Sequence, residues 1–308
     1  MNTPTPVDFP LPGLRMHALE AGPADGPLVL LLHGFPELSE SWRDVMPPLA
    51  RAGFHVVAPD LRGYGGTDRP RGGYDVDTLA EDVARLAHHL QPDRPAHVVG
   101  HDWGGAIAYH LAATKPQAVD RLVVINAPHL AVFARRIWLP PQLWRSWYIF
   151  FFLLPWLPEH VLSAHGGQRV SRWIRAALSD RSRVSEDRLD PYARNMARPD
   201  AARAALAYYR EAMKGAVTSR RRRRQLRDYP RIRAPFLLIW GEDDGALGRE
   251  LTQGLEPYFE SPPTVRFLPG VGHFVPLEAP GQVASLVLGH LGRAEPDASP
   301  GGGGAPTK

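Results

Sequence analysis

The strongest constraint on the fold is a series of short apolar segments, each four or five residues long and bounded by turn residues. Most consist of β-branched residues and leucine, without the alternation of polar and apolar residues that marks a half-buried strand. Continuous runs of this length are typical of strands that are buried on both faces of a parallel sheet. The sequence therefore predicts strands at residues 28–32, 55–58, 96–99, 122–125, 236–240 and 265–268.

Helical patterns lie between several of these strands. Residues 78–90 carry apolar side chains at positions 79, 83, 86, 87 and 90, which fall on one face of a helix. Residues 103–114 and 282–291 are also predicted to be helical. Strands that alternate with helices indicate an α/β fold, with a mostly parallel central sheet and helices on both faces.

The alternation stops between residues 130 and 229, a region rich in aromatic residues and arginine but without a good strand pattern. We interpret it as a helical cap inserted between two strands of the sheet. The expected organisation is a core of residues 1–129 and 230–293, a cap of residues 130–229, and a flexible tail of residues 294–308. The proline-rich residues 1–12 are also expected to be loose.

Composition excludes several kinds of site. The chain has no cysteine, so it holds no disulfide, thiolate metal site, iron–sulfur cluster or cysteine nucleophile. This composition fits a cytoplasmic protein. The 36 basic residues exceed the 32 acidic ones by four, and arginines fill positions 220–224. We interpret this run as a solvated helix face and expect no nucleic-acid partner.

The most apolar segment is residues 147–157, with the sequence WYIFFFLLPWL. It is too short to cross the hydrocarbon core of a bilayer, which needs about 20 helical residues. We expect a buried or pocket-lining segment and no stable membrane insertion, with contact at a membrane surface as the alternative. The N-terminal segment lacks a basic stretch followed by an apolar one, so no secretion signal is predicted.

A Gly-x-Asp-x-Gly motif at residues 100–104 joins the predicted strand at 96–99 to the helix at 103–114. Small residues there allow a strained turn that projects one side chain, as in the nucleophile elbow of hydrolases. The projected residue is Asp102, where serine is the common choice, and the chain contains no Gly-x-Ser-x-Gly motif. Alternatively, Asp102 only caps the helix, a role that aspartate performs well.

An acidic loop follows the predicted strand at residues 236–240, and it contains Glu242, Asp243 and Asp244. We choose Asp244 as the acid that would orient a catalytic histidine, and keep the other two as alternatives. Asn126, which follows the preceding strand, can orient an imidazole but carries no charge.

His273 follows the last predicted strand. The chain order of a nucleophile, an acid and a histidine is that of the α/β-hydrolase triad. Functional side chains collect at the carboxyl edge of open α/β sheets. We therefore expect Asp102, Asp244 and His273 to act together.

The loop after the predicted strand at residues 28–32 reads His33-Gly34-Phe35-Pro36. In this position a loop can supply one backbone N–H to an oxyanion hole, and the residue after the nucleophile supplies the other. The expected donors are the backbone N–H groups of Phe35 and Trp103.

These motifs together resemble the epoxide hydrolases of the α/β-hydrolase fold. The resemblance covers about residues 10–293 and implies that Asp102 is the nucleophile, His273 the base and Asp244 the acid. Its motifs are HGFPE (33–37), DLRGYGGTDRP (60–70), GHDWGG (100–105), WGEDD (240–244) and GVGHFVPLEAP (270–280).

The resemblance also implies two cap tyrosines above the nucleophile. Tyr148 matches the first, although Leu153 stands where the family usually has glutamine. Tyr209 matches the second, and the adjacent Tyr208 is the alternative. Five further residues are expected at the substrate pocket: His33, Pro36, Trp147, Phe152 and Phe274.

For an enzyme of this family, a carboxylate opens the epoxide and forms an alkyl ester, while the tyrosine hydroxyls protonate the departing oxygen. A histidine then activates water, which hydrolyses the ester and releases a vicinal diol. The resemblance therefore implies a lipophilic or aryl epoxide and water as reactants, without a metal or organic cofactor.

Two other functions remain open from the sequence. Haloalkane dehalogenases share the aspartate nucleophile and the tryptophan after it, here Trp103, but need a second halide donor. Phe35 occupies one usual place for that donor, whereas a cap tryptophan can supply it. The other alternative is a non-catalytic ligand-binding protein of the same fold, which a complete triad with both tyrosines argues against.

Overall fold

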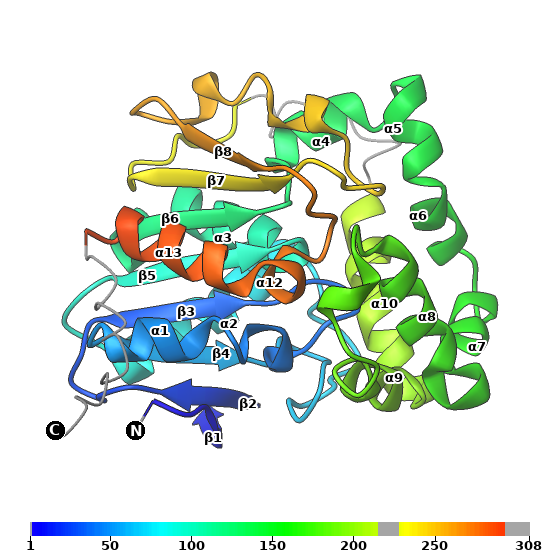
Figure 1. Cartoon of the computed structure of the whole chain (residues 1–308), viewed down its shortest axis with the longest axis horizontal. Coiled ribbons are helices and arrows are strands. Elements are labelled where there is room, and N and C mark those ends of the chain that lie inside the picture. Colours follow the sequence, from blue (N-terminus) through cyan, green and yellow to red (C-terminus); the bar gives the residue numbers. More distant parts are fainter. Residues whose placement is uncertain (1, 215–227, 293–308) are drawn as a thin grey trace, which may run out of the picture.

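The computed structural model of the chain describes residues 2–214 and 228–292. Its centre is an eight-stranded sheet with the order β1-β2-β4-β3-β5-β6-β7-β8 (Figure 1). The pairs β1–β2 and β2–β4 are antiparallel, and all later pairs are parallel. The strands are β1 (Thr5–Leu11), β2 (Leu14–Ala21), β3 (Leu28–Leu32), β4 (His55–Pro59), β5 (Ala96–His101), β6 (Val119–Ile125), β7 (Phe236–Gly241) and β8 (Thr264–Leu268).

The central strands are buried on both faces, which explains their continuous apolar sequences. In β3, Leu28, Leu30 and Leu32 belong to the apolar cluster on one side of the sheet. Val29 and Leu31 belong to the cluster on the other side. Because successive side chains of a strand point to opposite faces, each residue of β3 must be apolar.

Helices cover both faces of the sheet. Figure 1 shows α1 (Met46–Arg51), α12 (Val275–Glu278) and α13 (Pro280–His290) in front of the strands. Behind the strands lie α2 (Val76–Leu90) and α3 (Trp103–Thr114). The expected α/β class is therefore confirmed.

All the predicted strands and helices are present, and their ends differ from the predicted ones by at most three residues. The start of α2 shows why such differences arise. Asp75 accepts a hydrogen bond from the backbone N–H of Thr78 at 3.0 Å, so the helix begins two residues before its first expected position.

The prediction that residues 1–12 are loose is wrong, because β1 pairs along its whole length with β2. Neither strand was predicted from the sequence. β1 is the edge of the sheet, and its Pro6 and Pro10 are exposed while Phe9 and Leu11 are buried. An edge strand has only one neighbour, so it tolerates proline, which lacks an N–H group.

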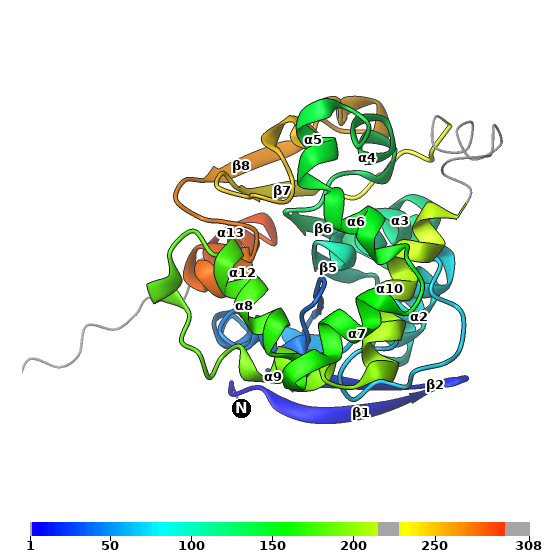
Figure 2. The same cartoon turned by 90° about the vertical axis from the view of Figure 1, so that its right-hand side faces the viewer.

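The described part of the chain between β6 and β7 forms a group of helices that we call the inserted helices, α4 to α10. They lie beyond the carboxyl ends of the strands, on the right of Figure 1, and face the viewer in Figure 2. The described residues contain no helix of the length and apolarity required to cross a membrane. The inserted helices are α4 (Leu130–Arg136), α5 (Pro140–Arg145), α6 (Trp147–Phe152), α7 (Leu157–Ser163), α8 (Gln168–Ala177), α9 (Asp190–Met196) and α10 (Pro199–Met213).

Two of the earlier expectations fall outside the described residues. These are the arginine run at residues 220–224 and the tail at residues 294–308.

Candidate active site

The turn between β5 and α3 holds Asp102 in a conformation that favours glycine. Its φ and ψ angles are 48° and −115°, an unusual backbone conformation for a residue with a Cβ atom. Asp102 occupies the N-cap position of α3, but its side chain makes no capping hydrogen bond. A Cβ atom on Gly104 would lie 2.2 Å from the carbonyl oxygen of Leu32, so only glycine lets the turn pack this closely. The alternative role of Asp102 as a helix cap is therefore wrong.

The imidazole of His273 lies between two carboxylates. Its Nε2 atom is 3.8 Å from Oδ2 of Asp102, and its Nδ1 atom is 2.7 Å from Oδ2 of Asp244. Asp102 follows β5, Asp244 follows β7, and His273 follows β8, so the sheet brings together residues that are far apart in the sequence. This is the geometry of a nucleophile, a base and an orienting acid.

Within the acidic loop, only Asp244 contacts the histidine. Its Oδ1 atom accepts backbone hydrogen bonds from Ala246 at 2.7 Å and Leu247 at 2.8 Å, which fix the carboxylate. By contrast, Glu242 pairs with Arg249, and Asp243 accepts a hydrogen bond from Ser179. The geometry therefore favours Asp244 over its two neighbours.

Asn126 also reaches the acid. Its side-chain amide donates a hydrogen bond to Oδ2 of Asp244 at 2.7 Å, and its Oδ1 atom accepts one from the backbone N–H of Gly241 at 2.7 Å. Asn126 therefore orients the carboxylate that in turn orients His273. From the sequence, Asn126 was considered only as a direct hydrogen-bond partner of the imidazole.

The backbone donors expected for an oxyanion hole point at Asp102. The N–H of Phe35 donates to Oδ1 of Asp102 at 2.8 Å, and the nearby backbone N–H of Trp103 also lowers the pKa of this carboxylate. Gly34 allows the loop to approach so closely, because a Cβ atom on it would lie 2.5 Å from Cβ of Asp102. Negative charge that develops on this oxygen would be stabilised by both groups.

The two carboxylates determine the protonation of His273. Burial lowers the pKa of His273, but the charge and hydrogen bond of Asp244 and the charge of Asp102 outweigh it and raise the pKa to about 9. The imidazole is therefore protonated at neutral pH. Burial raises the pKa of Asp102, although the charge of His273 partly opposes this effect. The pKa of Asp244 is lowered, because its contacts with His273 and Asn126 outweigh the effect of burial.

Two tyrosines from the inserted helices face this site. The rings of Tyr148 in α6 and Tyr209 in α10 are 6.3 Å apart. Burial raises the pKa of both hydroxyls, and the charge of Asp102 raises it further. Both hydroxyls therefore keep their protons at neutral pH and can donate them near Asp102. The indole of Trp103 packs edge-on against the ring of Tyr209, with centroids 5.1 Å apart.

Tyr208 has a different environment from Tyr209. Its hydroxyl donates a hydrogen bond to the backbone carbonyl of Arg62 at 2.7 Å, and its ring packs against Tyr64 and Tyr74. Adjacent residues of a helix point about 100° apart, so only one of the two can face Asp102. The structure favours Tyr209 as the tyrosine of the site.

Aromatic rings form a wall between the sheet edge and the inserted helices. Phe152 lies 5.3 Å from Phe35 and 5.1 Å from Tyr209, measured between ring centroids. Trp173 of α8 lies 5.7 Å from both Phe35 and Tyr148. It is one of the cap tryptophans that were considered above only as halide donors. The side chains that surround the triad on this side are therefore mainly aromatic.

The other expected pocket residues have different positions. Trp147 is 64% exposed and packs against Phe151, so the structure does not bring it to the triad. His33 is buried, and its Nε2 atom accepts the backbone N–H of Leu61 at 3.0 Å, which supports the loop. Phe274 packs against the ring of His273 with a centroid distance of 5.1 Å.

Pro36 is also buried, in the loop that presents the backbone N–H of Phe35. The peptide bond between Phe35 and Pro36 is cis. The expected place of Pro36 at the substrate pocket stays a prediction.

Glu37 and His101 form a buried ion pair beneath the triad. This pair was not identified from the sequence, although both residues fall in motifs quoted above. Oε2 of Glu37 is 2.6 Å from Nδ1 of His101, and the other ring nitrogen of His101 is 2.9 Å from the carbonyl oxygen of His273. Burial raises the pKa of Glu37, but the charge and hydrogen bond of His101 outweigh it and lower the pKa to about 2. Glu37 also accepts the backbone N–H of Gly34 at 3.0 Å. The pair thus connects the oxyanion loop to the backbone that carries His273.

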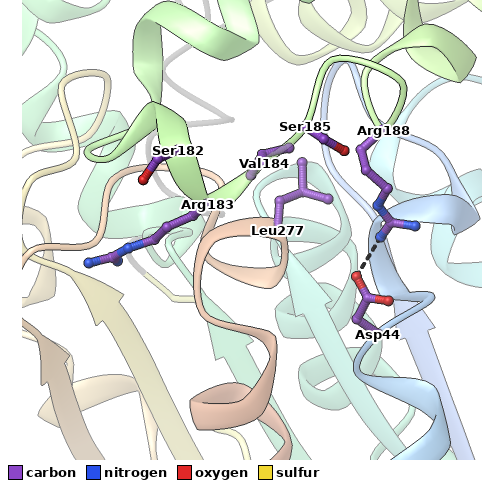
Figure 3. Close-up of a pocket in the computed structure, with 7 residues that line it drawn as sticks. All are labelled: Asp44, Ser182, Arg183, Val184, Ser185, Arg188 and Leu277. Atoms are coloured by element: carbon purple, nitrogen blue, oxygen red, sulfur yellow. Dashed lines mark hydrogen bonds and ion pairs between the residues drawn. The ribbon is translucent and has the colours of Figure 1, made fainter.

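A separate hollow of about 310 Å³ lies on the surface between the core and the loop after α8 (Figure 3). An ion pair of 2.7 Å between Arg188 and Asp44 crosses it. None of the expected site residues lines this hollow, so it is distinct from the triad. The lining residues are Asp44, Ser182, Arg183, Val184, Ser185, Arg188 and Leu277.

The geometry defines a hydrolase class, and comparisons with known proteins agree. Residues 27–280 match the family described as alpha/beta hydrolase fold, so the chain belongs to this family. It is 37% identical to the AB hydrolase superfamily protein YfhM of Bacillus subtilis, over 91% of this chain and 95% of the relative.

More specific relatives are epoxide hydrolases. The chain is 32% identical to epoxide hydrolase 3 of Mus musculus, over 91% of this chain and 74% of the relative. Its fold also resembles a solved structure of epoxide hydrolases from metagenomes of hot environments. That comparison gives a TM-score of 0.79 and 32% identity, and it covers 93% of this chain and 98% of the other. Within its family, the chain therefore groups with enzymes of the epoxide hydrolase class.

Proposed function

We propose that this enzyme hydrolyses lipophilic epoxides to vicinal diols through an alkyl ester on Asp102. The single observation that carries the proposal is the position of the Asp102 carboxylate. It lies between the imidazole of His273 at 3.8 Å and the backbone N–H of Phe35 at 2.8 Å, below two protonated tyrosines. A nucleophile, a base, an oxyanion hole and a proton donor therefore converge on one point.

In the first step, an oxygen of Asp102 attacks one epoxide carbon from the side opposite the ring oxygen. The new C–O bond forms as the ring C–O bond breaks, so the electron pair of the broken bond moves to the departing oxygen. One of the hydroxyls of Tyr148 and Tyr209 gives its proton to this oxygen, and the other donates a hydrogen bond. The product of this step is a neutral ester of Asp102 with a β-hydroxyalkyl group.

Formation of the ester changes the charge beside His273. The negative charge of Asp102 is lost, so the pKa of His273 falls and the imidazolium releases its proton. The phenolate left by the first step takes up one proton. The net effect is a neutral imidazole that is ready to act as a base near neutral pH.

In the second step, His273 takes a proton from water, and the hydroxide oxygen attacks the carbonyl carbon of the ester. The backbone N–H groups of Phe35 and Trp103 stabilise the resulting oxyanion, and one such donor is typically worth about 3 kcal/mol. The intermediate collapses, and His273 returns the proton to the leaving alkoxide, so the diol departs and leaves Asp102 as a carboxylic acid. Asp102 then gives its proton to His273, which restores the carboxylate and the imidazolium of the free enzyme. Asp244 holds the imidazole throughout.

The proposed substrate class follows from the aromatic side chains near the triad. Phe35, Phe152 and Trp173 present aromatic surface beside the reacting groups, which favours an aryl or long alkyl substituent. These side chains come from both the core and the inserted helices. We therefore propose that residues 130–229 act as a cap that closes the site over the substrate.

The haloalkane dehalogenase alternative is disfavoured by the ring that lies against Trp103. In that reaction the indole N–H would bind the departing halide, but here the indole packs edge-on against the ring of Tyr209, with centroids 5.1 Å apart. The same contact suits the epoxide reaction, since it helps to place a proton donor over Asp102.

The test is to trap the ester. In the variant His273→Gln, the first step is expected to proceed and the second to stop. Mass spectrometry should then show the peptide with Asp102 heavier by the mass of the added epoxide. The variant Asp243→Asn alters an acid of the same loop that lies outside the triad, and it should turn over without accumulating an adduct.

Two results would overturn the proposal. One is diol formation by the His273→Gln variant at the wild-type rate with no modified peptide. The other is release of bromide from bromoalkanes by an enzyme that leaves styrene oxide and longer alkyl epoxides unchanged.

A further inference from the structure

The inserted helices carry an unusual concentration of exposed apolar side chains. Among the described residues, every large apolar side chain with high exposure lies between positions 138 and 157. Trp144 is 80% exposed and Trp156 is 74% exposed. We call this set the aromatic face: Trp138, Leu139, Leu143, Trp144, Trp147, Leu154, Trp156 and Leu157.

The aromatic face lies on the side of the molecule away from the sheet. Its residues belong to α5, the start of α6, the start of α7 and the turns that join them to α4 and to each other. Figure 1 shows α5, α6 and α7 along the margin opposite the strands, and Figure 2 shows them toward the viewer. Trp138 packs against Phe150 of α6 with ring centroids 5.9 Å apart, which connects two parts of the face.

Such exposure is unfavourable in water. Each Å² of apolar surface left in contact with water forgoes about 25 cal/mol of burial free energy. A single exposed apolar residue is ordinary, but a group gathered on one surface marks a site of contact. The aromatic face is therefore expected to be covered when the protein works.

The charges of this segment indicate what covers it. Residues 130–158 contain no aspartate or glutamate, but they contain Arg135, Arg136 and Arg145. Two carboxylates lie nearby: Glu250 pairs with Arg145 at 3.0 Å, and Glu159 of α7 pairs with Arg210. Arg135 and Arg136 therefore leave the surface around the face with a net positive charge, which attracts an anionic partner and disfavours self-association of two like-charged copies.

The composition fits a lipid surface best. Tryptophan prefers the boundary between the hydrocarbon and the headgroups of a bilayer, and arginine beside it binds anionic headgroups. The helices of the face have six or seven residues, so they can lie in this boundary but cannot span it.

We propose that the aromatic face docks reversibly on the surface of an anionic bilayer. The tryptophan rings enter the headgroup layer, and the arginines contact the lipid phosphates. This docking is independent of the chemistry proposed for Asp102. It does, however, suit a lipophilic substrate, because Tyr148 and Phe152 of α6 contact the aromatic wall of the site while Trp147 of the same helix is exposed.

The experiment is flotation of the full chain with vesicles. One set contains phosphatidylcholine alone, and the other contains phosphatidylcholine with a quarter of phosphatidylglycerol. We expect the protein to float with the anionic vesicles, to float less with neutral ones, and to dissociate as salt is added.

Three variants report on the face. Replacing both Trp144 and Trp156 by glutamate should lower the binding constant at least about 10-fold, whereas replacing both by phenylalanine should retain most of it. Arg136→Gln should lower binding to anionic vesicles about 5-fold. The matched control is Arg233→Gln, because Arg233 is exposed and precedes the amino end of β7, at the opposite end of the strands. It should bind like the wild type.

Circular dichroism should show that each variant is folded, and its diol formation from a small water-soluble epoxide should match that of the wild type. Equal vesicle binding by the wild type and the double glutamate variant would overturn the proposal. Absence of vesicle binding by the wild type would also overturn it. This includes the case in which light scattering shows a dimer that the double glutamate variant abolishes, because the face would then bind a second copy of the chain. Flotation involves no catalysis, so a failed docking proposal is distinguishable from a failed reaction mechanism.

Discussion

The protonation of His273 gives the sharpest quantitative prediction. In the free enzyme its imidazole lies between Asp244 and Asp102, and its pKa is raised to about 9. Esterification would remove the charge of Asp102. The variant Asp102→Asn imitates this change, because an amide is similar in size to the carboxylate but neutral at every accessible pH.

The size of the effect follows from one distance. Two unit charges separated by the 3.8 Å between Nε2 of His273 and Oδ2 of Asp102 interact by about 4 kcal/mol at an effective dielectric constant of about 20. This energy corresponds to about 3 pKa units. The pKa of His273 is therefore expected to fall from about 9 to about 6 in Asp102→Asn.

The assay is an NMR titration of the His273 ring, with selectively labelled histidine, in the wild type and in Asp102→Asn. The histidine signals can be assigned with the His273→Gln variant. Asp243→Asn serves as the control for loss of a nearby carboxylate, because Asp243 hydrogen-bonds Ser179 and does not contact the imidazole.

A shift of the His273 pKa by less than one unit in Asp102→Asn would contradict this prediction. It would mean that the charge of Asp102 does not hold the proton on His273, so ester formation would not convert the imidazole into a base. A large shift in Asp243→Asn would also refute it, since the effect would then not depend on the triad geometry.

Three further predictions concern the tyrosines and the stability of the fold. The double variant Tyr148→Phe with Tyr209→Phe should slow epoxide opening by about 10²–10⁴-fold, measured as ester formation in a single turnover, and wild-type speed would contradict the role of both hydroxyls. Tyr208→Phe should keep that speed but lower the free energy of unfolding by about 1 kcal/mol in urea denaturation, because it removes the hydrogen bond to Arg62. The pKa of His273 is raised to about 9 in the folded state, so its protonated imidazole should add about 3 kcal/mol to the free energy of unfolding. The full contribution is expected below about pH 6.5, and it should be lost as the pH rises through about 9. Chemical denaturation of the wild type and His273→Gln at several pH values checks this, and a constant difference between them would contradict it.

The central sheet could be predicted because it is encoded locally. The residues of β3 alternate between two apolar clusters, so a fully apolar run was enough to identify the strand. β1 could not be predicted in the same way, since Pro6 and Pro10 argue against a strand unless its position at the edge is known. Edge position is a property of the whole sheet and not of the segment.

The candidate site shows a similar division. Asp102, Asp244 and His273 each follow a predicted strand, so chain order and the sheet edge were sufficient to group them. The difference between Tyr208 and Tyr209 depends on how α10 is rotated against the core, which no local pattern specifies. Trp147 was expected in the pocket, but its side chain is largely exposed, because α6 turns other residues toward the site.

The buried pair of Glu37 and His101 illustrates a third kind of limit. Both residues stand in motifs that were noted, but their contact depends on how the ends of β3 and β5 meet. Nothing in the sequence of these two motifs indicated that their side chains would pair. Only the three-dimensional arrangement shows that they support the backbone of His273.

The tyrosines and the triad come from different parts of the chain. Tyr148 and Tyr209 are held by α6 and α10, whereas Asp102, Asp244 and His273 are held by loops of the sheet. In the proposed reaction, ring opening needs both parts, but ester hydrolysis needs only the second. Exchange of the segment between β6 and β7 would thus alter which leaving groups can be protonated, while the hydrolysis of the ester stays intact. One scaffold can therefore acquire new substrates through a change in a single insertion.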